Sequence, residues 1–307
     1  MISILMATYN GETYLRQQIE SLLNQTRQDF VLYVCDDCST DGTYRILLGY
    51  AEQYPDRIKV YQNSQNSGDA KWNFLGMMLR HQDDYVMLCD QDDVWQPDKI
   101  ELSLAAVQER EKAVGRQTPV LMHTDLYVVD EELRIINPSL NYMLGLSMKF
   151  GTMASQVIQN TITGCTSMYN RALAELIKAP SFCIMHDWWL GLIVTAFGQK
   201  VYLPQATMMY RQHGRNAIGA KQVRSLAYIV RRMLHVRDIR AQLDATYRQA
   251  AAFLQEYGAQ LSAGQREFLQ EYSTIPQFPK FARWRKIDKL RAIKSGFVQR
   301  IAQFLYI

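Results

Sequence analysis

The chain has 307 residues, 48% of them apolar and 21% charged, and this composition predicts a globular protein of one large domain plus an appendage and excludes disordered and fibrous classes. Its formal net charge of +4 is uneven, because residues 1–220 hold 18 Lys and Arg against 24 Asp and Glu, whereas residues 221–307 hold 16 against 6. No run of about 18 apolar residues occurs, which excludes a helical membrane span, and an odd, scattered set of five cysteines with no signal peptide ahead of it favours a reducing cytoplasmic compartment.

The first part of the chain alternates between short apolar runs and helical spacing. Strands are predicted at residues 2–8, 30–35, 58–61 and 85–89, and helices at residues 13–24, from 44 onward, and at 72–80. This alternation implies right-handed β–α–β crossovers and a mostly parallel sheet. Ligands bind such sheets outside the carboxyl ends of the strands. The sequence places three polar stretches there, at residues 8–12, 36–39 and 90–93.

The remainder of the chain is predicted to add strands and then helices. A strand pair is expected within residues 120–130, and single strands at 162–169, 201–203 and 208–210, with a helix at 188–197. From about residue 221 apolar residues recur at helical spacing until Pro276 and Pro279 interrupt it. We therefore expect an α/β fold, with a main domain over residues 1–220 and a helical, basic extension over residues 221–307. Neither a glycine-rich dinucleotide motif nor a Walker-type phosphate loop occurs, so those two kinds of site are excluded.

The segment at residues 88–95 holds three carboxylates within four residues, those of Asp90, Asp92 and Asp93. Carboxylates this close repel one another and raise each other's pKa unless a cation lies between them. Hard oxygen ligands select Mg²⁺ or Mn²⁺. A solvated acidic turn is the alternative. The segment ends an apolar strand and precedes Trp95, however, and this context favours a metal site.

Seven stretches in chain order carry the most specific pattern. They are ILMATYNGETYL at 4–15, VCDDCSTDGT at 34–43, NSGDAKWNF at 66–74, CDQDDVWQPDKI at 89–100, ITGCTSMYNRAL at 162–173, MHDWW at 185–189 and YRQHGRNAIG at 210–219. Together they resemble the family-2 glycosyltransferases of the GT-A fold, a Rossmann-like sheet flanked by helices, and especially the rhamnosyltransferase-like members that build bacterial cell-surface polysaccharides. The resemblance makes residues 1–220 the catalytic domain. Cys38 departs from the pattern, because the family usually has glycine after the paired aspartates.

The resemblance implies a binding site for a nucleotide-sugar donor carrying dTDP or UDP. The residues that would line it are Thr8, Tyr9, Asn10, Glu12, Asp36, Asp37, Asn66, Lys71, Asp90, Asp93, Trp95 and Arg211. Tyr9 would offer a ring to the base, Asp36 or Asp37 would accept the N–H of that base, and Asp90 would hold the ribose. Asp92 and His213 would bind Mg²⁺ or Mn²⁺. Packing or capping is the alternative role for each of these residues.

The acceptor side is expected around MHDWW. Inverting transfer needs one carboxylate that takes the proton of the acceptor hydroxyl on the face opposite the leaving group, and Asp187 is the candidate. A helix cap is the alternative, because Asp is also a common cap. Indole faces are suited to stacking on sugar rings, so His186, Trp188 and Trp189 are expected to line the acceptor site, together with Gly164, where a close backbone approach is possible.

The last 30 residues hold eight cations against a single acid, Asp288. Apolar residues at three-and-four spacing lie between these cations, a pattern typical of a helix on an anionic membrane surface. A homo-oligomer contact and a nucleic-acid patch are alternatives. The sequence has no nucleic-acid-binding fold signature, which disfavours the latter. We expect a cytoplasmic protein, peripheral on the inner face of the plasma membrane.

These features together predict an inverting, metal-dependent glycosyltransferase. Our first choice of donor is dTDP-rhamnose, with transfer to a hydroxyl of a growing, lipid-linked cell-surface polysaccharide. The alternatives are a UDP-hexose donor, a nucleotidyltransferase, or an inactive binding subunit of a polysaccharide-synthesis complex. A nucleotidyltransferase would need a glycine-rich, cationic loop after the first strand, and residues 8–12 lack a cation.

Overall fold

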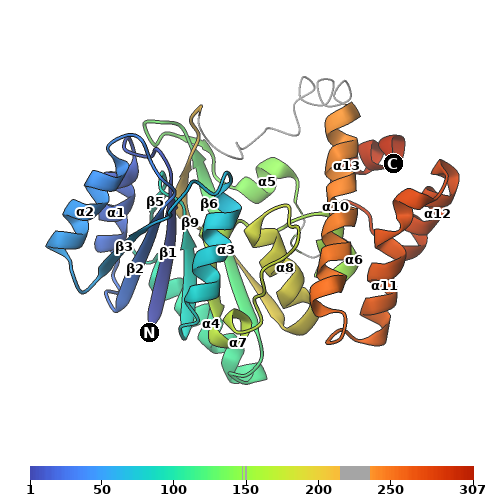
Figure 1. Ribbon diagram of the computed structural model, residues 1–307, viewed down its shortest axis with the longest axis horizontal. Coiled ribbons are helices and arrows are strands. Elements are labelled where there is room, and N and C mark those ends of the chain that lie inside the picture. The colour runs from blue at the N-terminus through green and yellow to red at the C-terminus, as the bar shows by residue number, and fades with distance from the viewer. Residues whose placement is uncertain (147, 149–150, 215–235) are drawn as a thin grey trace. The chain divides into compact units, whose positions relative to one another are not determined.

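The computed structural model of the chain describes residues 1–146, 148, 151–214 and 236–307 (Figure 1). Residues 215–235 lie outside the described part, and with them the end of the motif at 210–219 and the first part of the expected helical extension. The chain divides into two compact units. The sheet unit comprises Met1–Leu140, Ile162–Ile177 and Gly198–Gly219, and the helical unit comprises Asn141–Thr161, Lys178–Phe197 and Ala220–Ile307.

The N-terminal half of the sheet is parallel, as the alternation of strands and helices predicted. Its strands are β1 (Ile2–Thr8), β2 (Phe30–Asp36), β3 (Ile58–Gln62) and β4 (Tyr85–Cys89). They lie in the order β3-β2-β1-β4, every neighbouring pair parallel. The side chains of Ile4, Leu5 and Met6 on β1 are fully buried, because both faces of this part of the sheet are covered. The ends of β1, β2 and β4 therefore meet at one edge.

The other half of the sheet is mixed. It consists of β5 (Val94–Trp95), β6 (Val120–Val129), β7 (Ile135–Asn137), β8 (Ser167–Asn170) and β9 (Gln199–Arg211). Strand β8 runs antiparallel to β4 and β6, β6 is parallel to β9, and β5 is antiparallel to β9. The two late strands expected at 201–203 and 208–210 form the single strand β9. The 120–130 segment is one strand, and Gly164–Thr166 forms a 3-10 turn ahead of β8.

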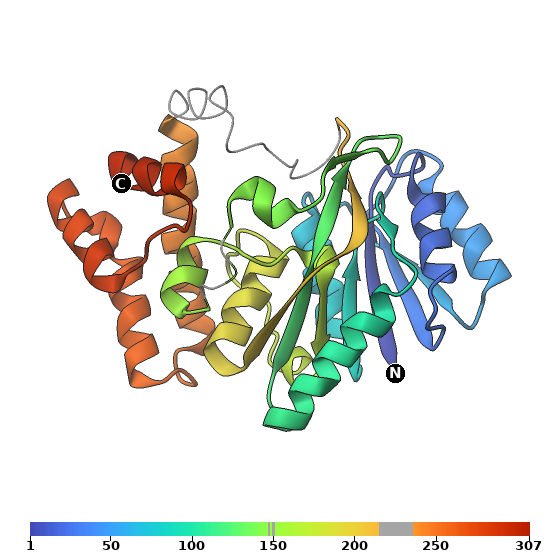
Figure 2. The ribbon, with the colours of Figure 1, turned by 180° about the vertical axis from the view of Figure 1, so that it is seen from behind.

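Helices cover both faces of the sheet. They are α1 (Leu15–Leu23), α2 (Thr43–Gln53), α3 (Ala70–Arg80), α4 (Lys99–Val114) and the short α7 (Arg171–Ala174). Helix α3 lies in front of the strands in Figure 1, whereas α4 lies in front of them when the molecule is seen from behind in Figure 2. The described structure is thus a mixed α/β fold with a helical C-terminal region, in agreement with the predicted class.

The helical unit is built around buried aromatic side chains. Its helices are α6 (Met153–Ile158), α8 (His186–Phe197), α10 (Val236–Tyr257), α11 (Ala263–Ser273), α12 (Lys280–Leu290) and α13 (Phe297–Tyr306). The short helix α5 (Leu140–Leu144) lies where the chain passes from the sheet unit into the helical unit. The ring of Trp189 lies 5.3 Å from that of Phe253 and 6.0 Å from that of Tyr257. The grouping differs from the expected division at residue 220, because residues 141–161 and 178–197 pack with the C-terminal helices. In the described part of the chain, every helix is too short or too polar to span a bilayer.

Candidate active site

Asp36, at the end of β2, joins three loops. It is fully buried, and its carboxylate accepts four hydrogen bonds, from Thr8 Oγ1 (3.1 Å), Ser39 Oγ (2.6 Å), the Ser39 amide (3.0 Å) and Gln62 Nε2 (3.1 Å). A carboxylate offers about four acceptor positions. The acceptor capacity of Asp36 is therefore taken up by the protein itself, and the residue fixes the geometry of the loop edge.

Asp37 is arranged differently. Its Oδ1 accepts Asn63 Nδ2 (2.7 Å) and the Ser67 amide (2.9 Å), while Oδ2 accepts Ser67 Oγ at 2.7 Å. Asn66 Nδ2 donates to the Asp37 carbonyl at 2.8 Å. Among the described donors only one reaches Oδ2, so this oxygen keeps the capacity to accept a further N–H. The sequence could not distinguish the two aspartates, and the structure does.

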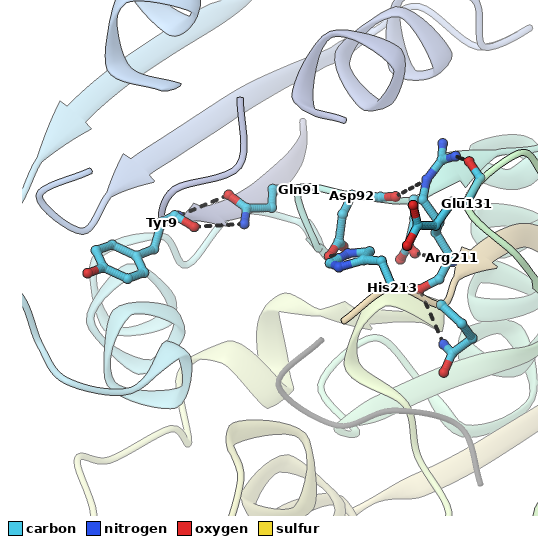
Figure 3. A network of polar contacts seen from close by, with 8 residues as sticks. Tyr9, Gln91, Asp92, Glu131, Arg211 and His213 are labelled. Atoms are coloured by element: carbon cyan, nitrogen blue, oxygen red, sulfur yellow. Dashed lines mark hydrogen bonds and ion pairs between the residues drawn. The ribbon is translucent and has the colours of Figure 1, made fainter. Parts of the chain in front are cut away.

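The loop after β1 is held against the acidic loop by Gln91. The amide of Tyr9 donates to Gln91 Oε1 at 2.9 Å, and Gln91 Nε2 donates to the Tyr9 carbonyl at 3.0 Å (Figure 3). A Cβ on Gly11 would lie 2.2 Å from Gln91 Oε1, so glycine is required for this approach. The Tyr9 side chain is 49% exposed. Gln91, which the sequence did not single out, thus orients a loop whose aromatic ring faces solvent.

Asn10 and Glu12 join the same loop to the one after β2. Asn10 adopts a left-handed backbone (φ 46°), and its Oδ1 accepts the Thr40 amide at 2.8 Å. Glu12 Oε2 accepts the Gly42 amide at 2.6 Å. Asn10 and Glu12 thus hold two loops together at the edge where the donor is expected.

Lys71 lies in the first turn of α3. Its ammonium forms an ion pair with Asp69 Oδ2 at 2.9 Å, and its side chain is 17% exposed. Asp69 is the N-cap of this helix and accepts the Lys71 amide. The cation is therefore held at the helix start, in the same loop as Asn66.

Asp93 is the most deeply buried of the three carboxylates in the acidic loop. It is fully buried; Oδ1 accepts the Arg211 amide at 3.0 Å, and Oδ2 has no hydrogen-bond partner among the described residues. Burial, with the neighbouring carboxylates of Asp92 and Asp90, holds the pKa of Asp93 well above its ordinary value. Ligand atoms of Asp90, Asp93 and Cys165 lie within 4.8 Å of one another. An unpartnered carboxylate oxygen in such a cluster is suited to a cation.

Cys165 was not predicted as a site residue. It follows Gly164 in the 3-10 turn, and this turn packs against β4, so the expected acceptor-side glycine lies next to the acidic loop. Burial, followed by the carboxylates of Asp90 and Asp93, raises the pKa of the Cys165 thiol well above its usual range. The sequence feature that could have identified Cys165 was its position in the family-like stretch ITGCTSMYNRAL, directly after Gly164.

The predicted metal ligands Asp92 and His213 are in contact, although they are far apart in the sequence. Asp92 Oδ2 lies 2.8 Å from His213 Nε2, and their side chains are 16% and 8% exposed (Figure 3). The ring of Tyr14 lies 4.9 Å from that of His213. The end of β9 thereby brings an imidazole to the acidic loop, so that a carboxylate and an imidazole are available as ligands at one position.

Arg211 cross-links the acidic loop. It is 2% exposed, and its Nε donates to the Asp92 carbonyl at 2.9 Å while Nη2 donates to Gln17 Oε1 at 2.6 Å. Its Nη1 donates to the Glu131 carbonyl (Figure 3). The guanidinium is thus engaged by protein acceptors in the sheet unit, and it positions the loop that carries Asp92.

A buried lysine lies beneath the acidic loop. Lys99 is fully buried, with its ammonium 4.6 Å from the centre of the Trp95 ring and 3.3 Å from Thr207 Oγ1. Burial lowers the pKa of Lys99 to about 8, against the opposing effect of the thiols and carboxylates nearby. Trp95 is itself only 3% exposed, so it packs under the loop, whereas the family resemblance implied that it would line the donor site.

Four of the expected acceptor-side residues, at positions 186–189, lie in the helical unit, whereas Gly164 belongs to the sheet unit. Asp187 is the second residue of α8, 9% exposed, and its Oδ1 accepts Asn160 Nδ2 at 2.9 Å. Trp188 donates its indole N–H to the Gln156 carbonyl at 2.6 Å. Trp189 is fully buried in the aromatic core, so its ring is a packing element; its neighbour His186 is 6% exposed. These neighbours fix the first turn of α8 around the candidate base.

Curated protein sequences and solved protein structures resemble the chain over most of its length. It is 31% identical over 211 residues to a putative teichuronic acid biosynthesis glycosyltransferase (TuaG) of Bacillus subtilis, covering 67% of this chain and 78% of that protein. It is 28% identical over 229 residues to the dTDP-rhamnosyl transferase RfbG of Shigella flexneri, covering 70% of this chain and 74% of that protein. The mannosyltransferase PcManGT of Pyrobaculum calidifontis, solved with GDP-Man and Mn²⁺, has the same fold, with a TM-score of 0.51 at 16% identity over 95% of this chain and 85% of that one.

The family model for glycosyl transferase family 2 matches residues 3–177, more than half of the chain. This segment contains the loops of β1, β2 and β4 whose side chains form the contacts described above. The predicted GT-A fold and enzyme class are thereby confirmed, and the chain belongs to glycosyl transferase family 2.

Proposed function

We propose that the protein transfers a sugar, with inversion, from a nucleotide-diphosphate donor to a hydroxyl of a growing cell-surface polysaccharide. The observation that carries this proposal is the acidic loop at the carboxyl end of β4, where Asp93 Oδ2 is buried without a described partner and Asp92 contacts His213. A metal-assisted leaving group needs a cation held by hard oxygen ligands, and ligands of such sheets bind outside the carboxyl ends of the strands.

The donor nucleotide would bind across the loops of β1 and β2. Tyr9 would pack its exposed ring on the base, and Asp37 Oδ2 would accept the base N–H, since Asp36 is saturated by four protein donors. Lys71 would lie toward the phosphates. Asp90 would hold the ribose. The hydrogen bonds of Gln91, Asn10 and Glu12 between the loops would hold these groups in position before the donor binds.

Asp92 and His213 would hold Mg²⁺ or Mn²⁺, and the bound ion would stabilise the negative charge of the departing diphosphate by several kcal/mol as a Lewis acid. Asp187 would take the proton of the acceptor hydroxyl as that oxygen forms its bond to the anomeric carbon, and the bond from that carbon to the diphosphate would break on the opposite side. The first turn of a helix favours an ionised carboxylate. This is the state that a base requires.

The donor we propose is dTDP-rhamnose, which the name of the RfbG relative supports. A UDP-hexose is the alternative within the same chemistry. Purified protein with Mn²⁺ should release dTDP from dTDP-rhamnose faster than UDP from UDP-hexoses. Preferential turnover of a UDP-hexose would refute the rhamnosyl assignment, and no turnover of any nucleotide sugar would favour an inactive binding subunit.

We further propose that α12 and α13 rest on an anionic membrane that carries a lipid-linked acceptor. Phe281 is 76% exposed and Leu305 47% exposed. The Lys280 ammonium bonds the Leu305 carbonyl at 2.9 Å and so joins the two helices. Arg285 on α12 is exposed as well, and the combination of exposed apolar side chains and cations on these two helices suits such a surface.

Liposome sedimentation tests this localisation. Each surface cation contributes ~1 kcal/mol to binding of anionic vesicles, so Lys280→Glu/Arg285→Glu should dissociate the protein from phosphatidylserine vesicles at low salt. The matched control is Arg266→Glu on α11. Equal partition of parent and double variant would refute the membrane role, and a concentration-dependent change in mass for the parent alone would favour self-association instead.

A further inference from the structure

The candidate base is tied to a second helix. Asn160 Nδ2 donates to Asp187 Oδ1 at 2.9 Å, and the indole N–H of Trp188 donates to the Gln156 carbonyl at 2.6 Å. Asn160 follows directly after α6 and its C-cap Gln159, and both partners belong to the helical unit. The direction of the Asp187 carboxylate is therefore set from outside its own helix.

The amide of Asn160 is itself oriented. Gln156 is fully buried, and its Nε2 donates to Asn160 Oδ1 at 3.4 Å. With Oδ1 turned toward Gln156, the Nδ2 group of Asn160 is turned toward Asp187. Helix α6 is in turn fixed by a capping box between Thr152 and Ser155. A chain of contacts thus runs from the α6 backbone through two amide side chains to one oxygen of the base.

We propose that Asn160 is a positioning residue for Asp187, holding Oδ1 so that the carboxylate presents a fixed orientation to the acceptor hydroxyl. This inference rests on the proposed function, in which Asp187 accepts the proton. A hydrogen bond to a carboxylate is charge-assisted and directional. Proton transfer requires the base within hydrogen-bond reach of the proton. A displacement of about 1 Å in such a geometry lowers the rate by about 100-fold.

The first test is turnover of the nucleotide sugar selected by the donor panel, with water as acceptor. Asn160→Ala should lower kcat by roughly 10- to 100-fold and leave the Kd of the nucleotide diphosphate within about twofold of the parent. Asn160→Asp keeps the shape and the acceptor for Gln156 but cannot donate, so it should lose at least as much and serves where the alanine variant fails to fold. The neighbouring Gln159→Ala is the control, because it removes a bond to the Ser295 amide (2.8 Å) without touching the base. It should retain parental kcat.

The second test is a double-mutant cycle with Asp187→Asn. If Asn160 acts through Asp187, Asn160→Ala in the Asp187→Asn background should cause no more than about a twofold further loss. The positioning role would be overturned if the kcat losses of Asn160→Ala and Asp187→Asn multiplied in the double variant. It would also be overturned if Asn160→Ala and Gln159→Ala lowered kcat equally. A parental kcat in both Asn160 variants would also overturn it while leaving the base assignment intact. A parental kcat in Asp187→Asn would instead remove the base assignment, and this inference with it.

Discussion

Replacing Lys99 by Met tests the electrostatics under the acidic loop. The side chain is fully buried, and its pKa is lowered from 10.5 to about 8, chiefly by burial. Each pKa unit corresponds to about 1.4 kcal/mol, so the charged lysine costs the folded state on the order of 3 kcal/mol near neutral pH. Methionine fills a similar volume without charge. It forgoes the contact with the Trp95 ring, worth ~1 kcal/mol, and we expect Lys99→Met to stabilise the protein by about 2 kcal/mol at pH 7.

The sign of the pH dependence follows from the direction of the shift. Because the folded-state pKa lies below the unfolded one, the cost is fully present below about pH 8 and is lost as the pH rises toward 10.5. The stability advantage of Lys99→Met should therefore shrink between pH 7 and pH 10. Tyrosine ionisation near pH 10 affects parent and variant alike, so the difference between them is the quantity to follow.

The assay is urea denaturation of parent and variant at pH 7, 8, 9 and 10. The matched control is Lys112→Met on the same helix, because Lys112 is exposed and its replacement should change stability by less than about 0.5 kcal/mol at every pH. A Lys99→Met variant that is less stable than the parent at pH 7, or whose stability difference does not depend on pH, would refute the reasoning.

Three further substitutions test the loop edge. Asp92→Ala should abolish metal-dependent binding of the nucleotide diphosphate in calorimetry; affinity that survives chelator in the parent would contradict a metal at this loop. Cys38 adopts a left-handed backbone (φ 63°), which costs about 1–2 kcal/mol for a residue other than glycine. Cys38→Gly should therefore raise the stability of the protein by about 0.5–1 kcal/mol after the entropy cost of glycine. Equal melting temperatures for Cys38→Gly and Cys38→Val would exclude backbone strain at this position. Gly11→Ala should displace the Gln91 side chain and weaken donor binding several-fold. In a Gln91→Ala background the same change should have little further effect on the donor Kd. If the two changes weaken donor affinity additively in free energy, the two residues act separately.

The sequence predicted the parallel half of the fold well because its inner strands, such as β1 and β4, are apolar on both faces. An uninterrupted run such as residues 2–8 needs no knowledge of its neighbours to be recognised. Strand β9 was divided into two because Pro204 and the polar residues after it break the apolar pattern. In the structure β9 follows β6 through register shifts near Asp125, a pairing between distant segments that local periodicity cannot reveal.

Charged residues were harder to assign than strands. Lys99 follows Asp98 at a helix start, where a lysine is ordinarily exposed, and only the packing of Trp95 and β9 buries it. Asp36 and Asp37 are adjacent and chemically identical in the sequence. They differ because the donors that reach them come from segments up to 30 residues away.

The residues marked by the family resemblance fall into two physical groups. Asp36 and Arg211 are buried and spend their hydrogen-bonding groups on other protein atoms, whereas Tyr9 is half exposed and Asp37 keeps an oxygen with a single described donor. In the proposed function, a nucleotide would displace water but not these protein contacts, so the first group would act on the donor only by fixing where the second group lies. Pre-organisation of this kind lowers the ordering cost of binding.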